Sequence, residues 1–378
     1  MQDKHSLNYK ASTTFVVAWG VYNIIKTSCL RSFYINIFWQ MIIINKKEEK
    51  MEGKFKIVFI DYYFPDIQKE INQFKKLGNI EIIDCNNILP GLIASEDQLL
   101  PHLKKLNALD TDAVLVNHAI ITSKFIRQLT NCKIILRYGI GVDNIDIKAA
   151  QAMGIRVANV PDYCIEEVSE NAVALILVCT RKMFNQYKLL EKHQFNYEAI
   201  KPIHRLSHLT LGLLAFGKIA QRVAEKIKNF NIKIIAYDPH FTKRKNYDFI
   251  QFVELDELLM KADIISIHVP LNPETYHFIN EKMINKMKKG VMIINTARGG
   301  LVEEDALYEG LISGKIACAG LDVLEIADEN TYYRSKLMLL DNVIVTPHTS
   351  WYSEEATYDL QVKAGQIVYN ELLKYLDN

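Results

Sequence analysis

The stretch from residue 209 to residue 224 reads Leu209-Thr-Leu-Gly-Leu-Leu-Ala215-Phe216-Gly217-Lys218-Ile219-Ala220-Gln-Arg-Val-Ala224. It predicts a strand, a tight turn and the start of a helix, and a second strand over 233–237 ends at Asp238. The free N–H groups and the dipole at the N-terminus of such a helix favour the binding of a pyrophosphate. The Asp238 carboxylate at the end of the second strand can accept hydrogen bonds from ribose hydroxyls. We therefore predict a dinucleotide site formed by Ala215, Phe216, Gly217, Lys218, Ile219 and Asp238.

The glycine pattern of this turn is incomplete. Ala215 and Ala220 stand where the pattern G-x-G-x-x-G has its first and third glycines. The third position tolerates alanine, whereas a methyl group at the first, a tight-turn position, is expected to weaken binding. The Asp238 carboxylate would repel a 2′-phosphate, so NAD is favoured over NADP. Taken by itself, the motif is also compatible with an ordinary strand–helix crossover that holds no ligand.

Strand and helix patterns alternate along the chain from about residue 51. Short runs rich in Val, Ile and Leu are typical of parallel strands that are covered on both faces. The expected strands are 56–61, 80–84, 113–117, 133–137, 156–160, 209–215, 233–238, 263–269, 290–296, 317–323 and 342–346. Because eleven strands are many for one sheet, we predict an α/β protein with two doubly wound parallel-sheet domains. Long helices are expected over 166–183 and from Ser353 onward.

The composition of the 378 residues, 49% hydrophobic and 24% charged, is that of a globular protein. The net charge of +1 predicts binding neither to nucleic acid nor to an anionic membrane. Six cysteines without a C-x-x-C pair indicate buried thiols in the cytoplasm and no metal site. Residues 1–50 carry two apolar runs that are too short to span a membrane, so we expect an extension outside the folded core. A membrane or partner anchor is the alternative for this segment.

Further motifs follow one another in the second half of the chain. They are Gly290-Val-Met-Ile-Ile-Asn295-Thr296-Ala297-Arg298-Gly299-Gly300-Leu301-Val302, Ala319-Gly320-Leu321-Asp322-Val323 and Val345-Thr346-Pro347-His348. Two upstream stretches accompany them, Arg137-Tyr-Gly139-Ile-Gly-Val-Asp143-Asn-Ile-Asp146 and Asn159-Val160-Pro161. In order and spacing, these motifs resemble those of the D-isomer-specific 2-hydroxyacid dehydrogenases. The stretch 346–356 is similar, more narrowly, to the C-terminal-binding-protein-like branch of that family.

The resemblance implies an arrangement of domains and an activity. A Rossmann NAD-binding domain over 158–346 would be inserted into a flavodoxin-like substrate domain made of 51–157 and 347–378. The active site would lie in the cleft between them. A homodimer is expected, because members of the family usually dimerise through the cofactor domain. The implied reaction interconverts a D-2-hydroxy acid and its 2-keto acid by hydride transfer with NAD.

The resemblance also implies roles for single residues. Arg298 would bind the substrate carboxylate and polarise its carbonyl, and a surface ion pair is the alternative. His348 would act as general acid and base, and an ordinary core or helix-entry histidine is the alternative. The residues implied at the cofactor are Thr296, Ala297 and Asp322, and those implied at the substrate are Arg137, Gly139 and Trp351. Trp351 would favour a bulky or apolar substrate side chain, unless it is a packing aromatic between the domains.

One departure from the family pattern concerns the acid that orients the histidine. The family has a glutamate five residues after the aspartate of its Gly-Leu-Asp-Val motif, and this chain has Ala327 there. Either Glu329 or Glu325 orients His348 in place of this glutamate, or the pair of carboxylate and histidine is broken. In a broken pair, the pKa of the His348 imidazole falls and the pH optimum of the activity moves down. A catalytically weakened NAD(H)-binding dimer that acts as a corepressor-like sensor or binding module is therefore the alternative function.

Overall fold

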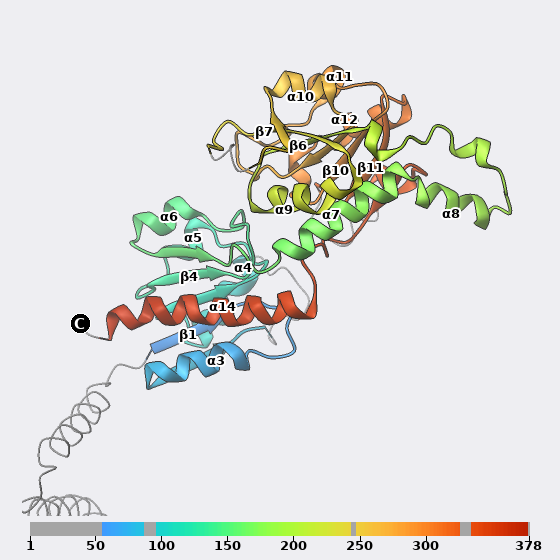
Figure 1. Cartoon of the computed structure of the whole chain (residues 1–378). Coiled ribbons are helices and arrows are strands. Elements are labelled where there is room, and N and C mark those ends of the chain that lie inside the picture. The colour runs from blue at the N-terminus through green and yellow to red at the C-terminus, as the bar shows by residue number, and fades with distance from the viewer. Residues whose placement is uncertain (1–54, 87–95, 243–246, 326–333, 377–378) are drawn as a thin grey trace, which may run out of the picture.

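Two parallel β-sheets covered by helices form two lobes of the molecule (Figure 1). The structure is a computed structural model, and it describes residues 55–86, 96–242, 247–325 and 334–376. The extension predicted over 1–50 lies outside these described residues. The sheets confirm the predicted fold class, an α/β protein with two parallel-sheet domains.

The five-stranded domain holds the first part of the described chain, and its strand order is β2-β1-β3-β4-β5 with every neighbour parallel. Its strands are β1 Phe55–Phe59, β2 Ile80–Asp84, β3 Ala113–Val116, β4 Ile134–Arg137 and β5 Arg156–Asn159. Its helices are α3 Gln68–Phe74, α4 Glu96–Lys105, α5 Ser123–Ile126 and α6 Ile147–Ala152. The central strand β3 is buried along its whole length, as expected for a strand covered on both faces.

The seven-stranded domain has the order β12-β11-β10-β9-β6-β7-β8, again with parallel neighbours. Its strands are β6 Thr210–Leu214, β7 Lys233–Tyr237, β8 Ile250–Phe252, β9 Ile264–Ile267, β10 Val291–Asn295, β11 Ile316–Leu321 and β12 Val343–Val345. Its helices are α9 Lys218–Ile227, α10 Leu255–Lys261, α11 Glu281–Lys286 and α12 Glu304–Ile312. All eleven predicted strands are present, and β8 was missed because polar Gln251 interrupts its three residues, whereas β12, of the same length, is apolar throughout.

The long helix predicted over 166–183 is wrong at its end, because the structure divides it. α7 spans Ile165–Thr180, and α8 spans Met183–Glu191 after Lys182, whose φ of +49° lies in the left-handed region. α7 packs along α9 and against β10 and β11. α8 begins an arm, residues 183–205, that extends away from the seven-stranded domain (Figure 1).

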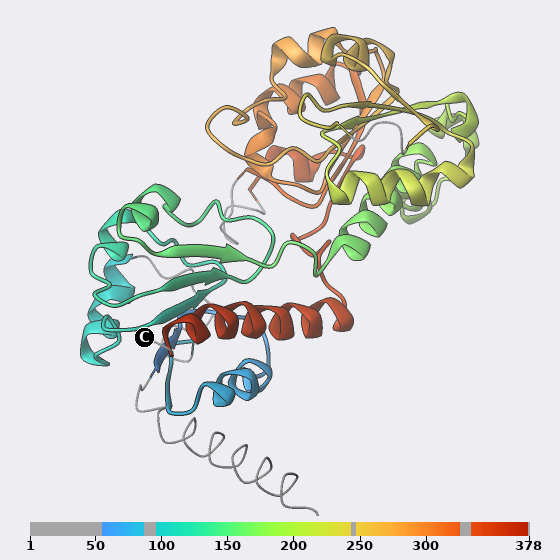
Figure 2. The same ribbon diagram turned by 60° about the vertical axis from the view of Figure 1, so that its left-hand side comes forward.

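The C-terminal helix α14, Glu354–Leu372, returns to the five-stranded domain and packs against α3 and β4 (Figure 2). It starts where the sequence predicts, because the Ser353 hydroxyl accepts from the Ala356 N–H at 2.8 Å and Glu354 and Glu355 occupy the first turn. The chain therefore passes between the two domains twice, once before α7 and once before α14.

Short 3₁₀ helices complete the described secondary structure. They are η1 Lys75–Leu77, η2 Tyr197–Ile200, η3 Leu206–His208, η4 Lys228–Phe230, η6 Gly299–Leu301, η7 Lys336–Leu339 and η8 Leu373–Tyr375. Within the described ranges, no helix has both the length and the apolar character that a bilayer crossing requires. Five cysteines lie in those ranges, and each is a free, buried thiol.

A buried carboxyl group links α3 to α14 and to the sheet of the five-stranded domain. Glu70 is fully buried, and its oxygens accept from the Tyr138 hydroxyl at 2.8 Å and from the Gln361 amide at 3.2 Å. Burial raises the pKa of Glu70 from 4.5 to about 7, although both hydrogen bonds act to lower it. The proton affinity of this group is therefore higher in the folded than in the unfolded chain.

This difference predicts a pH-dependent stability. As the pH rises from 4.5 to about 7, unfolded Glu70 releases its proton before folded Glu70 does, so the free energy of unfolding falls. We expect this group to account for a loss of about 3 kcal/mol. Glu70→Gln cannot titrate, and it should remove this slope in denaturant unfolding measured between about pH 5 and about pH 8. The exposed control Glu355→Gln should keep the wild-type slope, and an unchanged slope in Glu70→Gln would contradict the prediction.

Candidate active site

A cavity of about 870 Å³ lies between the two domains, and both domains line it. Asn117 and Arg137 reach it from the carboxyl ends of β3 and β4, and Thr296 and Asp322 reach it from the ends of β10 and β11. The carboxyl ends of parallel strands are where open α/β sheets bind ligands. Arg298 and His348, which belong to separate sequence motifs, line the same cavity.

Arg298 follows β10 and is held in a fixed orientation. The Asn295 side chain accepts from the Ala297 N–H at 3.0 Å and donates to the Arg298 carbonyl at 2.9 Å, which fixes the turn. The Arg298 guanidinium donates from Nε to Asp143 Oδ1 at 3.1 Å and from Nη1 to the Ala297 carbonyl at 2.8 Å. A Cβ on Gly141 would lie 1.9 Å from Nη2, so only glycine lets the guanidinium lie here.

Asp143 belongs to the five-stranded domain, so its ion pair with Arg298 crosses the cleft. Burial acts to raise the pKa of Asp143, but the Arg298 guanidinium and its hydrogen bond outweigh burial and hold the pKa below the usual value. Asp143 is therefore ionised at neutral pH and faces the cavity as a carboxylate.

Arg137 supplies a second guanidinium to the same cavity. Its Nε donates to the Asn117 carbonyl at 3.2 Å, and burial together with the Arg298 charge lowers its pKa. Gly139 makes room for it, since a Cβ there would lie 1.5 Å from Arg137 Nη1, and its φ of +137° is strained for other residues. Among the described residues, no carboxylate forms an ion pair with Arg137. An anion in the cavity would relieve this uncompensated charge.

His348 follows β12 with a φ of +54°, and its N–H donates to the Asp322 carbonyl at 2.9 Å. Its ring is open to the cleft, yet the surrounding protein still replaces much of its water. This desolvation lowers the pKa of His348 to about 4, and Arg298, His118 and Arg137 lower it further. Within the described residues, no carboxylate is hydrogen-bonded to the ring.

The structure excludes one of the two predicted substitutes for the family glutamate. Glu325 accepts from the Tyr276 hydroxyl at 2.5 Å and contacts His277 Nε2 at 2.7 Å, so this carboxylate is engaged with residues other than His348. The suggestion of Glu325 is therefore wrong for this structure. Ala327 and Glu329 lie outside the described residues.

Asp322 lines the cavity and shapes the loop that carries His348. Its carboxylate accepts from the Thr346 hydroxyl at 2.5 Å and from the N–H groups of Thr349 and Ser350 at 3.0 Å each. Burial raises its pKa in spite of these bonds. The side chain thus holds the His348 loop, while the predicted position beside the nicotinamide stays a prediction.

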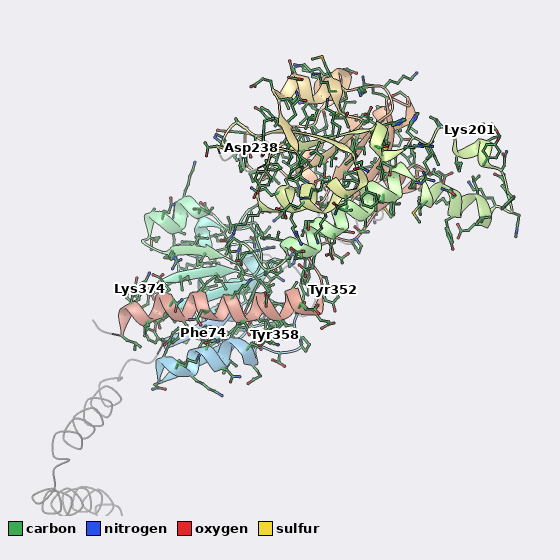
Figure 3. All side chains as sticks on the ribbon, in the orientation of Figure 1. Phe74, Lys201, Asp238, Tyr352, Tyr358 and Lys374 are labelled. Carbon is green, nitrogen blue, oxygen red and sulfur yellow. The ribbon has the colours of Figure 1, made fainter. Side chains whose placement is uncertain are left out.

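The predicted dinucleotide turn lies between β6 and α9. Asp238, labelled in Figure 3, directly follows β7 and accepts from the Phe216 N–H and the His240 N–H, both at 2.8 Å. Phe216 turns its side chain into an aromatic cluster with Phe241, Tyr247 and Phe252, so only its backbone faces the turn. Lys218 is exposed, and Ile219 is half-buried and lines the cavity.

Three features of the seven-stranded domain fit a bound dinucleotide. Gly217 caps α9, and a Cβ there would have no heavy atom within 4 Å, which leaves open space at the helix N-terminus. Thr296 carries the only buried side-chain polar atom without a hydrogen-bond partner among the described residues, and Thr296 lines the cavity. Asp238 supplies the carboxylate that ribose hydroxyls require. Ala297 also lines the cavity, next to Thr296.

Trp351 is half-buried and lines the cavity, and it also packs against aromatic neighbours. Its ring centroid lies 6.3 Å from that of Tyr163 and 5.6 Å from that of Tyr352. Trp351 therefore occupies both predicted positions, the pocket wall and the packing contact. Within the described ranges, no group of three His, Cys, Asp or Glu side chains could hold a metal ion.

The sequence did not point to His118, which lines the cavity two residues after the end of β3. The Asp61 carboxylate fixes this turn by accepting from the N–H groups of Asn117, His118 and Ala119 at 2.8, 2.6 and 3.0 Å. The His118 ring packs edge-on against Tyr63 with centroids 5.0 Å apart. Its place at a strand end, the same signal that identified Asp238, could have revealed it.

The chain matches known proteins over most of its length. A family model described as D-isomer specific 2-hydroxyacid dehydrogenase, NAD binding domain, matches residues 173–350. A hydroxypyruvate reductase of Thermotoga maritima is 41% identical over 264 residues, or 70% of this chain and 85% of that protein. A D-3-phosphoglycerate dehydrogenase of Methanocaldococcus jannaschii is 38% identical over 309 residues, or 81% of this chain but 55% of that protein. The crystal structure of D-lactate dehydrogenase from Aquifex aeolicus, complexed with NAD and lactic acid, matches with a TM-score of 0.73 at 28% identity, covering 85% of this chain and 96% of that one.

The chain therefore belongs to the D-isomer-specific 2-hydroxyacid dehydrogenase family, and it is an NAD-dependent oxidoreductase. The predicted family, enzyme class and cofactor are confirmed. The alternative of a corepressor-like binding module finds no support among these relatives. The narrower branch and the cytoplasmic location stay predictions.

Ala215 yields a test of the turn. Its φ of +66° is left-handed, and an L-residue with a Cβ is strained there by about 1 kcal/mol. We expect Ala215→Gly to raise the free energy of unfolding by up to that amount and to lower the Kd for NADH, because the methyl group stands at the turn that the pyrophosphate approaches. Denaturant unfolding and fluorescence titration with NADH measure the two effects. Asn231→Gly, also left-handed with a φ of +56° but outside the turn, should leave the Kd unchanged; equal effects of the two variants on the Kd would contradict the prediction.

Proposed function

We propose that this cavity is the active site of a dehydrogenase that interconverts a D-2-hydroxy acid and its 2-keto acid. The proposal assigns substrate binding to 51–157 with 347–378, and NAD binding to 158–346. The observation that carries it is that Arg298 and His348 line one cavity at the ends of the parallel strands. NADH, when bound, supplies the hydride that reduces the keto carbon.

Arg298 binds the substrate in this proposal. A planar guanidinium can hold a carboxylate through two parallel hydrogen bonds and can polarise the neighbouring carbonyl. Arg298 lies half-buried in the cleft with its Nε already committed to Asp143, so its Nη2 is directed at Gly141 and the cavity. Arg137 and the Gly139 segment form the opposite wall, which belongs to the five-stranded domain.

His348 handles the proton. In reduction the imidazolium donates a proton to the alkoxide oxygen, and in oxidation the neutral imidazole takes the proton from the hydroxyl. Because desolvation and the nearby cations lower the pKa of His348 to about 4, the neutral form predominates near pH 7. Oxidation near neutrality therefore starts from the competent form, whereas reduction depends on the minor, protonated form.

These roles predict the kinetics of two variants. Arg298→Gln should lower kcat/KM for the keto acid by about 10²–10³, since it loses charge and fork geometry, and His348→Gln should lower it by about 10²–10⁴. NADH oxidation against pyruvate, hydroxypyruvate, 3-phosphohydroxypyruvate and phenylpyruvate measures this, and the Kd for NADH should stay at the wild-type value. Absence of turnover with every acid in the wild type would reject the proposed function.

The low pKa of His348 also predicts the direction of the pH dependence. For reduction, kcat/KM should rise as the pH is lowered from about 8 towards 5, because the fraction of imidazolium grows as the pH approaches its pKa. The His348→Gln variant should show no such rise. A wild-type rate that falls over this range would contradict the prediction.

We also propose a homodimer formed through the arm that begins with α8. None of the residues of α8 is buried, and a nine-residue helix is marginal in water without a partner. Phe195 is 98% exposed and Tyr187 61%. Figure 3 labels Lys201 on the returning limb of this arm, where its carbonyl accepts from Lys182 Nζ at 3.3 Å. A second copy of the chain would cover these apolar side chains.

The dimer proposal predicts the effect of charge on the arm. Tyr187→Asp combined with Phe195→Asp should convert the dimer to a monomer in light scattering coupled to size exclusion. Phe230→Asp, at an exposed apolar residue outside the arm, should leave the dimer intact. A monomeric wild type, or a dimer in the double variant, would reject the proposal.

A further inference from the structure

The described active site has an imidazole but no carboxylate bonded to it. Such a carboxylate would stabilise the imidazolium that reduction requires. Three described carboxylates line the cavity, those of Asp143, Asp146 and Asp322.

Two of these carboxylates serve the local backbone. Asp146 caps α6, where its side chain accepts from the Ala149 N–H at 3.0 Å. Asp322 accepts from a hydroxyl and two N–H groups of the His348 loop, and burial raises its pKa, which opposes its acting as a charge. Asp143 is left as the carboxylate that is ionised and directed across the cleft.

The charges around His348 determine how readily its imidazole holds a proton, and Asp143 is one of them. Arg298, His118 and Arg137 all disfavour a proton on His348, and among the described residues the Asp143 carboxylate opposes them. Lys148 lines the cavity as a further cation, and His268 stays neutral because burial lowers its pKa to about 4. The phenols of Tyr138 and Tyr163 and the thiol of Cys164 also line the cavity, and burial raises the pKa of each, so they carry no charge.

We propose, building on the function proposed above, that Asp143 is the positioning carboxylate of this active site. It orients the Arg298 guanidinium through Nε across the cleft, and it supplies the negative charge that favours a proton on His348. The family glutamate performs the second task from within the cofactor domain at the position that Ala327 occupies here. In this chain the charge comes from the facing domain.

The assignment has a geometric consequence. Asp143 follows β4 in the five-stranded domain, whereas Arg298 follows β10 in the seven-stranded domain. His348 lies two residues past the proposed domain boundary at residue 346, but its N–H and its loop are bonded to Asp322 at the end of β11, so it too faces Asp143 from the seven-stranded sheet. The carboxylate therefore acts on the imidazole only while the two domains face one another as they do here. Opening the cleft would remove both the hydrogen bond to Arg298 and the charge near His348.

The test compares charge with shape at residue 143. Asp143→Asn keeps the size and a hydrogen-bond acceptor but loses the charge, so the pH at which reduction is half-maximal should move down by about one unit, and kcat/KM near pH 7 should fall about tenfold. Asp143→Glu keeps the charge and should restore most of the wild-type profile. Asp146→Asn is the matched control, because asparagine also caps helices well and the pH profile should stay unchanged.

A second measurement does not depend on turnover. Nitrogen-15 NMR of the NADH-saturated protein follows the His348 ring, identified by the signal that His348→Gln removes. In Asp143→Asn the pKa of that ring should move down from its wild-type value, and in Asp146→Asn it should not move. If the wild type reduces none of the acids tried, the proposed function fails. The His348 titration still decides whether Asp143 favours a proton on the ring, because it requires no turnover.

Several results would overturn the inference. One is a pH profile and a His348 titration that are unchanged in Asp143→Asn. A second is a loss of kcat/KM that is equal at every pH, because Asp143 would then act on Arg298 alone. A third is a shift of the profile in Glu329→Gln without one in Asp143→Asn, which would assign the charge to Glu329.

Discussion

The direction of parallel strands is the constraint on which this active site depends. In both sheets every neighbouring strand runs the same way, so the residues that follow the strands collect at one edge of each sheet. The two edges face one cavity. Arg137, Arg298 and His348 are far apart along the chain, yet each lies at or within three residues of the carboxyl end of a strand, and that position brings them together. Loops of very different sequence can therefore contribute to one site without any of them being long.

Charge in this cleft is unevenly distributed. Two guanidiniums and three imidazoles line it, and the ionised Asp143 forms an ion pair with one of the guanidiniums, that of Arg298. The Arg298–Asp143 pair is partly exposed, with side chains 24% and 42% accessible, so it contributes little to stability. Its main effect is to fix the guanidinium, while Arg137, which has no ion pair among the described residues, favours an anionic ligand. An acid substrate would thus be attracted by Arg137 and oriented by Arg298.

The strands were predictable because parallel strands buried on both faces read as continuous apolar runs, and the Ser353 cap was predictable because it is local chemistry. The end of α7 was not, since the left-handed Lys182 leaves no mark that a helical pattern would show. Arg298 and His348 were found from motifs, whereas the pairing of Arg298 with Asp143, 155 residues away, depends on how two domains face one another. The rejection of Glu325 likewise required its contacts with Tyr276 and His277, which no spacing in the sequence expresses.

The return of α14 to the first domain has a mechanical consequence. The chain joins the two lobes at two places, before α7 and before α14 (Figure 2). Two interdomain connections therefore hold the lobes together. Two connections restrict the relative motion of the lobes more than a single linker would, because sliding one lobe along the other would have to extend one connection. The chain's own connectivity therefore favours opening by rotation over opening by translation.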